Sequence, residues 1–141
     1  MDTDIRGLTM ECRNILSINL TNCYNLTDDG IISLSVNCTK LKRVELMDCE
    51  KITDLSIKSI ANNCHDLRWL DITRCYKVTL SSIRIIKKNC KKLEKLYSYL
   101  WLDRNKNILS LIIISNVDIL EINSKILRSW LVYIGTFGFT C

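Results

Sequence analysis

The stretch CTKLKRVELMDCEKITDLSIKSIANNC, residues 38–64, decides the fold, because it recurs with a shift of 26 residues in both directions. Its forward copy covers residues 64–90, and its backward copy covers residues 12–38. Seven of the eight cysteines follow this register, in one series at Cys12, Cys38, Cys64 and Cys90 and in a second at Cys23, Cys49 and Cys75. Self-similarity at a fixed period of this length is typical of stacked units that bury their apolar faces against one another. The sequence therefore predicts a solenoid of 26-residue repeats.

Each unit has a strand half and a helix half. Val44 and Leu46 alternate with polar residues, which predicts a short strand with one face buried. Over residues 52–64 the apolar spacing changes to three and four, which predicts a helix. Thr53 is expected to cap this helix, and Asp54 places a negative charge in its first turn, where the helix dipole favours it. The residues expected to end the helices, in the left-handed conformation that asparagine tolerates, are Asn37, Asn63 and Asn89.

The frame Leu41-x-x-Val44-x-Leu46-x-x-Cys49, followed by Ile-Thr-Asp at the helix start and a closing cysteine, resembles the cysteine-containing leucine-rich repeat. Residues 12–98 are similar to the F-box leucine-rich-repeat substrate receptors of SCF-type ubiquitin ligases and to their mitotic-exit antagonist relatives. The resemblance implies an α/β solenoid with short parallel strands on the concave face and helices on the convex face. It also implies a protein substrate or adaptor on the concave face, ubiquitin-ligase subunits as further partners, and a role in ubiquitin-dependent protein catabolism. The chain contains no F-box motif, so direct docking to a Skp-type adaptor is in doubt.

The register divides the chain into three segments. Residues 1–11 align with the helix half of a repeat, so they are either part of a truncated repeat or an N-terminal cap. A truncated repeat would leave the strand edge near Ile18 and Leu20 open to pairing with other chains. Residues 12–98 carry the repeats. The frame fails in residues 99–141, which are a degenerate repeat, a C-terminal cap or an unrelated tail. For the chain as a whole, a truncated repeat fragment without function is a further alternative.

Cysteines at equivalent places in consecutive units are predicted to be reduced, buried packing residues. Disulfides and a metal site are the weaker alternatives. A metal site lacks the usual ligands, because the chain has no C-x-x-C pair and contains only one histidine, His65. Reduced thiols favour the cytoplasm or the nucleus. The first residues lack the apolar core of a signal peptide, and no run of about 18 apolar residues predicts a membrane span. We therefore expect no membrane association.

Neither a catalytic site nor a cofactor site is predicted. The chain has no phosphate-binding glycine loop, and His65 has no nucleophile at a suitable spacing. Basic residues cluster in the segment 82–106, where their charges suit a solvated helix end. The same cluster is an alternative binding site for an acidic partner or, less favoured, for nucleic acid. The residues of this basic patch are Arg84, Lys87, Lys88, Lys91, Lys92 and Lys95, followed by Arg104 and Lys106.

The expected binding residues lie in the strand halves and point out of the concave face between the buried positions. Stacking places Ser17, Arg43, Trp69 and Lys95 in one row and Asn19, Glu45, Asp71 and Tyr97 in the next. Tryptophan, tyrosine and arginine dominate interface energetics, although the ring of Trp69 could instead tuck against Arg43 or Lys95. The complete candidate set is Arg43, Glu45, Met47, Trp69, Asp71, Thr73, Lys95, Tyr97 and Tyr99.

Overall fold

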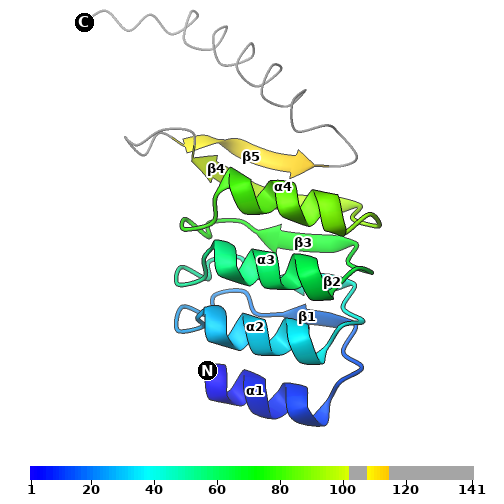
Figure 1. Cartoon of the computed structure of the whole chain (residues 1–141). Helices are drawn as coiled ribbons and strands as arrows, with labels where there is room; N and C mark the ends of the chain where they lie inside the picture. The colour runs from blue at the N-terminus through cyan, green and yellow to red at the C-terminus, as the bar shows by residue number, and fades with distance from the viewer. Residues whose placement is uncertain (102–107, 115–141) are drawn as a thin grey trace, which may run out of the picture.

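The computed structural model describes residues 1–101 and 108–114, and within them the chain is an α/β protein (Figure 1). The helices of this part are α1 (Asp2–Glu11), α2 (Asp28–Asn37), α3 (Asp54–Asn63) and α4 (Leu80–Asn89). Its strands are β1 (Ser17–Asn19), β2 (Arg43–Glu45), β3 (Trp69–Ile72), β4 (Lys95–Trp101) and β5 (Ile108–Ile114). Helices and strands alternate as far as β4, so the predicted α/β class is confirmed.

A single sheet contains these strands in chain order, from β1 to β5. The strands β1 to β4 are parallel, and each pairing joins residues 26 positions apart, such as Val44 with Leu70. The register predicted from the repeat is therefore confirmed. All four described helices cover one face of this sheet and stack in the order of the strands (Figure 1). No described helix covers the opposite face.

The strand β5 departs from the parallel order. It pairs antiparallel with β4, with Leu96 opposite Ile114 and a register shift between Tyr99 and Leu100. An antiparallel neighbour needs only a short connection, whereas a parallel one needs a crossover that is usually helical. The segment Ile108–Ile114 is thus a strand but not a further parallel unit. The remainder of the predicted degenerate repeat or tail, residues 102–107 and 115–141, lies outside the described residues.

The core lies between the sheet and the helices and is continuous across the units. The strands contribute fully buried Val44 and Leu70, and the helices contribute fully buried Ile57 and Ile60. Full burial of such a side chain contributes about 1.5–3 kcal/mol. Because each apolar face is covered by residues of the adjacent unit, stability depends on the stacking of units rather than on any unit alone.

Five thiols are part of this core, namely those of Cys38, Cys49, Cys64, Cys75 and Cys90. Each donates to a backbone carbonyl of the preceding unit; Cys49 Sγ lies 3.1 Å from Leu20 O, and Cys75 Sγ lies 3.0 Å from Leu46 O. The prediction of buried thiols is confirmed for these five. It is wrong for Cys12, which is exposed, and for Cys23, which is half-buried, because no described strand lies beyond β1 to cover them.

The helices begin as predicted but end differently. The hydroxyl oxygen of Thr53 accepts a hydrogen bond from Leu55 N, as a helix cap should. The left-handed ending predicted for the asparagines is wrong: the residue after α3 is Cys64 with φ −110°, and Asn63 Nδ2 instead donates to Ser59 O at 2.8 Å. The carbonyl of Ile60, one of the last four of α3, accepts from Cys64 N at 2.8 Å, so it is satisfied without a left-handed residue.

Aspartates at the first helical position join neighbouring units, a role that the sequence analysis missed. The carboxylate of Asp28 accepts from Thr53 N and Thr53 Oγ1, each at 2.8 Å, and from the hydroxyl of Ser56. Asp54 repeats these contacts with Thr79 and Ser82. Burial alone would raise the pKa of Asp28, but the hydrogen bonds from Ser56 and Thr53 outweigh it and hold that pKa below its ordinary value.

Replacing Asp28 by Ala should destabilise the protein by about 2 kcal/mol, because Thr53 N and the Ser56 hydroxyl lose a charged acceptor. The measurement is urea unfolding monitored by circular dichroism. The control is Asp29→Ala, since Asp29 is exposed and its carboxylate pairs, within the described residues, with Arg6 at the surface. Equal losses from both substitutions would contradict the linking role of Asp28.

The same carboxylates predict how stability depends on pH. Because folding lowers the pKa of Asp28 and Asp54, their contribution is complete above the unfolded pKa of about 3.9 and is lost as the pH falls through the lower folded value. The acid loss of stability in the wild type should therefore exceed that in Asp28→Ala. Parallel pH profiles for the two proteins would exclude a linked protonation of Asp28.

The buried thiols Cys38, Cys49, Cys64 and Cys75 should react slowly with a thiol reagent until the protein is denatured. Burial raises the pKa of Cys49 to about 11 and that of Cys64 to about 12, so little reactive thiolate is present at neutral pH. Exposed Cys12 provides the internal control and should react at once. Rapid native labelling of all four would be incompatible with the register.

Candidate functional site

The face of the sheet opposite the helices carries the candidate residues. Strand pairing places Arg43 beside Trp69 and Trp69 beside Lys95, and it places Glu45 beside Asp71 and Asp71 beside Tyr97. The two predicted rows are therefore confirmed. We call this set the open sheet face, which comprises Arg43, Glu45, Trp69, Asp71, Lys95 and Tyr97.

A stack of side chains runs across the open sheet face. Arg43 Cζ lies 3.9 Å from the centroid of the Trp69 ring, and Lys95 Nζ lies 4.9 Å from it. Neighbouring strands are about 4.8 Å apart, so a flat ring on the middle strand is within reach of a cation on either side. The ring of Tyr97 lies 5.1 Å from that of Trp69 and is tilted by 38°. Such cation–π contacts contribute about 0.5–1 kcal/mol each when exposed.

The indole of Trp69 is more enclosed than simple alternation suggests. Its side chain is half-buried, and its Nε1 is buried without a hydrogen-bond partner among the described residues. The ring lies against both Arg43 and Lys95, as the alternative predicted, and part of its surface is therefore buried within the chain. A tryptophan in this position holds the two flanking cations in defined orientations.

The acidic row is also engaged in local contacts. Glu45 accepts a hydrogen bond from Arg43 Nε at 2.7 Å, and it accepts another from Asn19 Nδ2 at 3.3 Å. Asp71 Oδ1 accepts from Thr73 N at 2.9 Å, which fixes the carboxylate at the end of β3. The charges on this face are thus balanced within the chain, and the guanidinium of Arg43 has both an ionic and an aromatic neighbour.

Of the remaining candidate residues, Met47 and Thr73 lie beyond the ends of their strands, whereas Tyr99 lies within β4. Thr73 was expected to be exposed, but it is buried, because β3 ends at Ile72 and the chain turns at Arg74. Met47 is half-buried beyond the end of β2. The backbone of Tyr99 belongs to β4, whereas its side chain lies outside the described residues.

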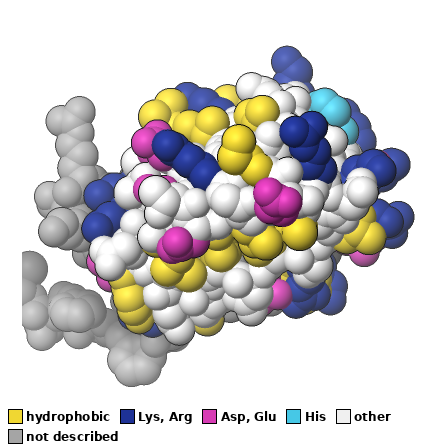
Figure 2. Space-filling model, turned by 90° about the horizontal axis from the view of Figure 1, so that it is seen from below, with side chains coloured by type: hydrophobic (Ala, Val, Ile, Leu, Met, Phe, Trp, Pro, Cys, Tyr) yellow, Lys and Arg dark blue, Asp and Glu magenta, His cyan; other side chains and the backbone are white. Residues whose placement is uncertain are grey.

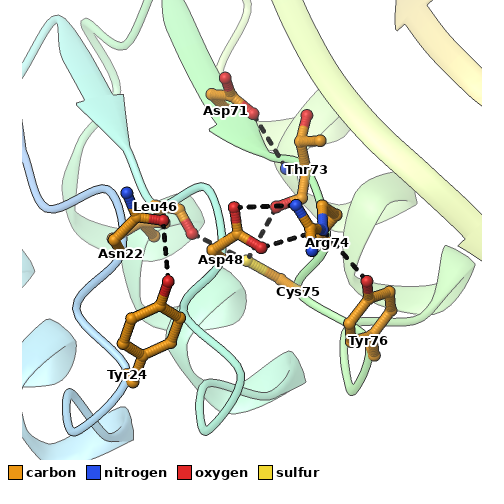
Figure 3. Close-up of polar contacts among 9 residues, drawn as sticks. All are labelled: Asn22, Tyr24, Leu46, Asp48, Asp71, Thr73, Arg74, Cys75 and Tyr76. Atoms are coloured by element: carbon orange, nitrogen blue, oxygen red, sulfur yellow. Dashed lines mark hydrogen bonds and ion pairs between the residues drawn. The ribbon is translucent and has the colours of Figure 1, made fainter.

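A polar cluster that the sequence analysis missed follows the strands (Figure 3). Asn22, Asp48 and Arg74 occupy equivalent positions, and all three have φ near +62°, a left-handed conformation that is uncommon for residues other than glycine. The side chain of Asp48 is 9% exposed, and its carboxylate lies 2.9 Å from Arg74 Nε. Arg74 Nε also donates to the hydroxyl of Tyr76. Asparagine and aspartate at one register position are the signal that indicates such a turn, whereas arginine at the third position conceals it.

The residues of the basic patch do not form one surface. Lys95 belongs to the open sheet face, whereas Arg84, Lys87 and Lys88 belong to α4 on the other side of the sheet. Lys91 and Lys92 lie in the turn after α4, and Lys92 Nζ forms an ion pair with Asp66. Arg104 and Lys106 lie outside the described residues. The structure therefore divides the cations that the sequence groups together.

Comparison with known proteins adds no assignment, since no known family matches the chain and no curated protein matches it. In residues 1–101 and 108–114, no group of three or more histidine, cysteine or acidic residues is arranged to hold a metal ion. Within the same ranges, no helix combines the length and the apolar character needed to cross a membrane. The candidate site is therefore argued from its geometry alone.

The left-handed turn at Arg74 predicts an unusual order of stability for two variants. Arg74→Ala and Arg74→Gly both remove the ion pair with Asp48, but glycine adopts φ of 62° without strain. Arg74→Ala should therefore be less stable than Arg74→Gly by about 1 kcal/mol in urea unfolding. Arg68 is the matched control, since it has an exposed ion pair with Glu94 and no positive φ. At this control position, the variant Arg68→Ala should be at least as stable as Arg68→Gly.

Proposed function

We propose that this chain is a protein-binding module built as a leucine-rich-repeat solenoid, and that the open sheet face binds its partner. The observation that carries the proposal is the stack of Arg43, Trp69 and Lys95 on three adjacent strands, with Tyr97 beside it. Trp, Tyr and Arg are the residue types that contribute most to protein interfaces. No described helix covers this face (Figure 1), and Lys95 is exposed on it.

The stack favours binding because its side chains are held in place before a partner arrives. Ordering a long side chain at an interface costs about 0.5–1.5 kcal/mol, and the Trp69 ring reduces that cost for Arg43 and Lys95. The Nε1 of Trp69 is buried and has no hydrogen-bond partner among the described residues, so the open sheet face offers a partner the ring of Trp69 rather than its N–H group.

The partner that suits this face is an extended protein segment that presents both an apolar side chain and charged groups. Trp69 and Tyr97 offer aromatic surface, while Lys95 and Glu45 offer charges of opposite sign on either side of it. We further propose that the partner is a substrate of an SCF-type ubiquitin ligase, which the chain would select for ubiquitin-dependent degradation. This second step rests on the resemblance of residues 12–98 to F-box leucine-rich-repeat receptors.

The test begins with peptides selected from a random display library against the intact chain. Trp69→Ala should weaken the selected peptides by about 2 kcal/mol or more, which is about a 30-fold rise in Kd, because it removes the centre of the stack. Fluorescence anisotropy measures Kd, and circular dichroism confirms that each variant is folded.

The matched control is Lys88→Glu combined with Lys91→Glu, on the side away from the open sheet face, which should leave Kd unchanged. If the lysine changes abolish binding, Trp69→Ala has no effect and affinity falls steeply with salt, the basic patch is the site instead. The ligase step has a separate readout, which is complex formation with a Skp-type adaptor. Without that complex the chain binds proteins but does not itself join the ligase.

A further inference from the structure

The turns that join each helix to the following strand carry an excess of positive charge. These turns are residues 12–16, 38–42, 64–68 and 90–94, and together they contain six Lys or Arg residues against two Asp or Glu residues. All six cations are exposed. Figure 2 shows Lys and Arg side chains gathered along the right-hand side of the molecule, which is the side on which the helices end in Figure 1. We call this surface the basic edge, and its cations are Arg13, Lys40, Lys42, Arg68, Lys91 and Lys92.

The basic edge is one surface because the turns stack in register. Arg68 N donates a hydrogen bond to Lys42 O, and Glu94 N donates to Arg68 O, so equivalent residues of successive turns are adjacent. Side chains repeat the step, since Lys40 Nζ donates to Asn14 Oδ1 of the preceding turn at 3.0 Å. The basic edge therefore differs from the basic patch of the sequence, because its cations come from four turns rather than from one segment.

Carboxylates are already bound at the basic edge. Asp66 forms an ion pair with Lys92, and the hydrogen bond from Lys92 together with the charges of Lys92, Lys42 and Arg68 lowers the pKa of Asp66. Glu94 Oε1 accepts from the guanidinium of Arg68 at 3.1 Å. The cations of the basic edge that form no ion pair within the described residues are Arg13, Lys40, Lys42 and Lys91.

The helix dipoles do not account for these cations. A cation is favoured in the last turn of a helix, and the effect falls off beyond that turn. The helices α1, α2 and α3 have no basic residue in their last turn, whereas α4 has Lys87 and Lys88. Lys42 and Arg68 each lie five residues beyond the last residue of the preceding helix. The positive charge therefore exceeds what the helix ends require, which indicates an anion from outside the chain.

We propose that the basic edge binds an acidic segment of another protein, which lies across the four turns in an extended conformation. The side chains of Asp66 and Glu94 show that these cations accept carboxylates at positions exposed to a partner. The four turns span about 14 Å where strands are about 4.8 Å apart and about 30 Å where helices are about 10 Å apart. An extended chain rises about 3.3 Å per residue, so about four to nine residues cover the basic edge.

Nucleic acid fits the basic edge less well than an acidic protein segment does. Single-stranded nucleic acid stacks its bases on aromatic rings, and none of the four turns contains Trp, Tyr or Phe. The phosphates of a duplex form a dense row of negative charge, which Asp66, Glu94 and the neighbouring Glu11 would repel. Helix N-termini favour phosphate, and those of the described helices lie on the opposite side of the molecule (Figure 1). A protein segment can instead place neutral side chains beside the carboxylates of the edge.

The test uses a fluorescein-labelled peptide of about eight glutamates, which is long enough to cross the four turns. Fluorescence anisotropy with the intact chain at low ionic strength measures Kd, and circular dichroism confirms that each variant is folded. The wild type should bind the peptide. Lys40→Glu combined with Lys42→Glu should raise Kd at least about 10-fold, because it brings like charges together. Absence of binding by the wild type would overturn the proposal.

The matched control is Lys51→Glu combined with Lys77→Glu, which changes the net charge equally in the turns that precede the helices. Both lysines are exposed, and Lys51 Nζ donates to Asn25 Oδ1 at 2.9 Å, as Lys40 does to Asn14. This control should leave Kd nearly unchanged. An equal loss of affinity in both double variants would reflect net charge alone and would overturn the site.

Removal of a competing carboxylate provides a second test. Asp66→Asn leaves the cations around Asp66 without their internal partner and should lower Kd for the glutamate peptide about 2–5-fold. The matched control is Asp29→Asn, which makes the same change of charge in the first turn of α2 and should have a smaller effect. Equal effects of the two substitutions would contradict competition at the basic edge.

Two further measurements separate this proposal from its alternatives. A single-stranded or duplex oligonucleotide of equal charge that binds more tightly than the peptide, and is weakened by Lys40→Glu with Lys42→Glu, would assign the basic edge to nucleic acid and overturn the proposal. Trp69→Ala should leave Kd for the glutamate peptide unchanged, because Trp69 lies on the open sheet face. Either proposal can therefore fail without the other.

Discussion

The structure depends on one constraint, which is that polar groups buried at a unit boundary find their partners in the adjacent unit. The carboxylate of Asp28 accepts from Thr53 and Ser56, and the thiol of Cys49 donates to Leu20 O. A buried polar group without a partner costs about 1–3 kcal/mol, so a slip of one residue between units would leave several groups unsatisfied at once. The strand pairings, which all join residues 26 apart, hold the same register on the other side of the core.

The sequence predicts this register because periodicity is a property of positions rather than of contacts. Recurrence every 26 residues is sufficient to place Arg43, Trp69 and Lys95 on adjacent strands, since parallel strands pair equivalent residues. The same reasoning finds the helix starts, where Thr53 has both the side chain and the position of a cap. Most of the fold and both rows of the open sheet face could therefore be predicted.

The details that escaped prediction are those in which two features of one residue compete. The charge of Asp28 is sufficient to explain its place in the first turn of a helix, so its hydrogen bonds to Thr53 were not predicted. Asn63 tolerates a left-handed turn, yet it is the last helical residue and its amide donates to Ser59 O, while Cys64 ends the helix with φ −110°. Arg74 adopts the left-handed turn although its residue type disfavours it, because the same turn precedes the cysteine at the end of each of the first three strand halves, Cys23, Cys49 and Cys75. Local propensity gives the wrong answer at these positions, where the repeat imposes the backbone.

The first unit of the stack shows that burial at a given repeat position depends on having a neighbouring unit on both sides. Within the stack, Leu34 and Cys38 are buried because neighbours exist on both sides, whereas Leu8 and Cys12 have the same register and remain exposed. A quasi-one-dimensional fold concentrates its unsatisfied surface at its ends, since each unit contacts only its neighbours. The antiparallel strand β5 closes one end of the described sheet by abandoning the parallel register. At the other end the chain keeps that register, and the carboxylate of Asp2 accepts from Thr27 N and Thr27 Oγ1 as the aspartates of the later units do from Thr53 and Thr79. Gly30 stands there at the position of Ser56 and Ser82, so the pairing of aspartate with threonine, and not the serine contact, is what every described boundary between helices shares.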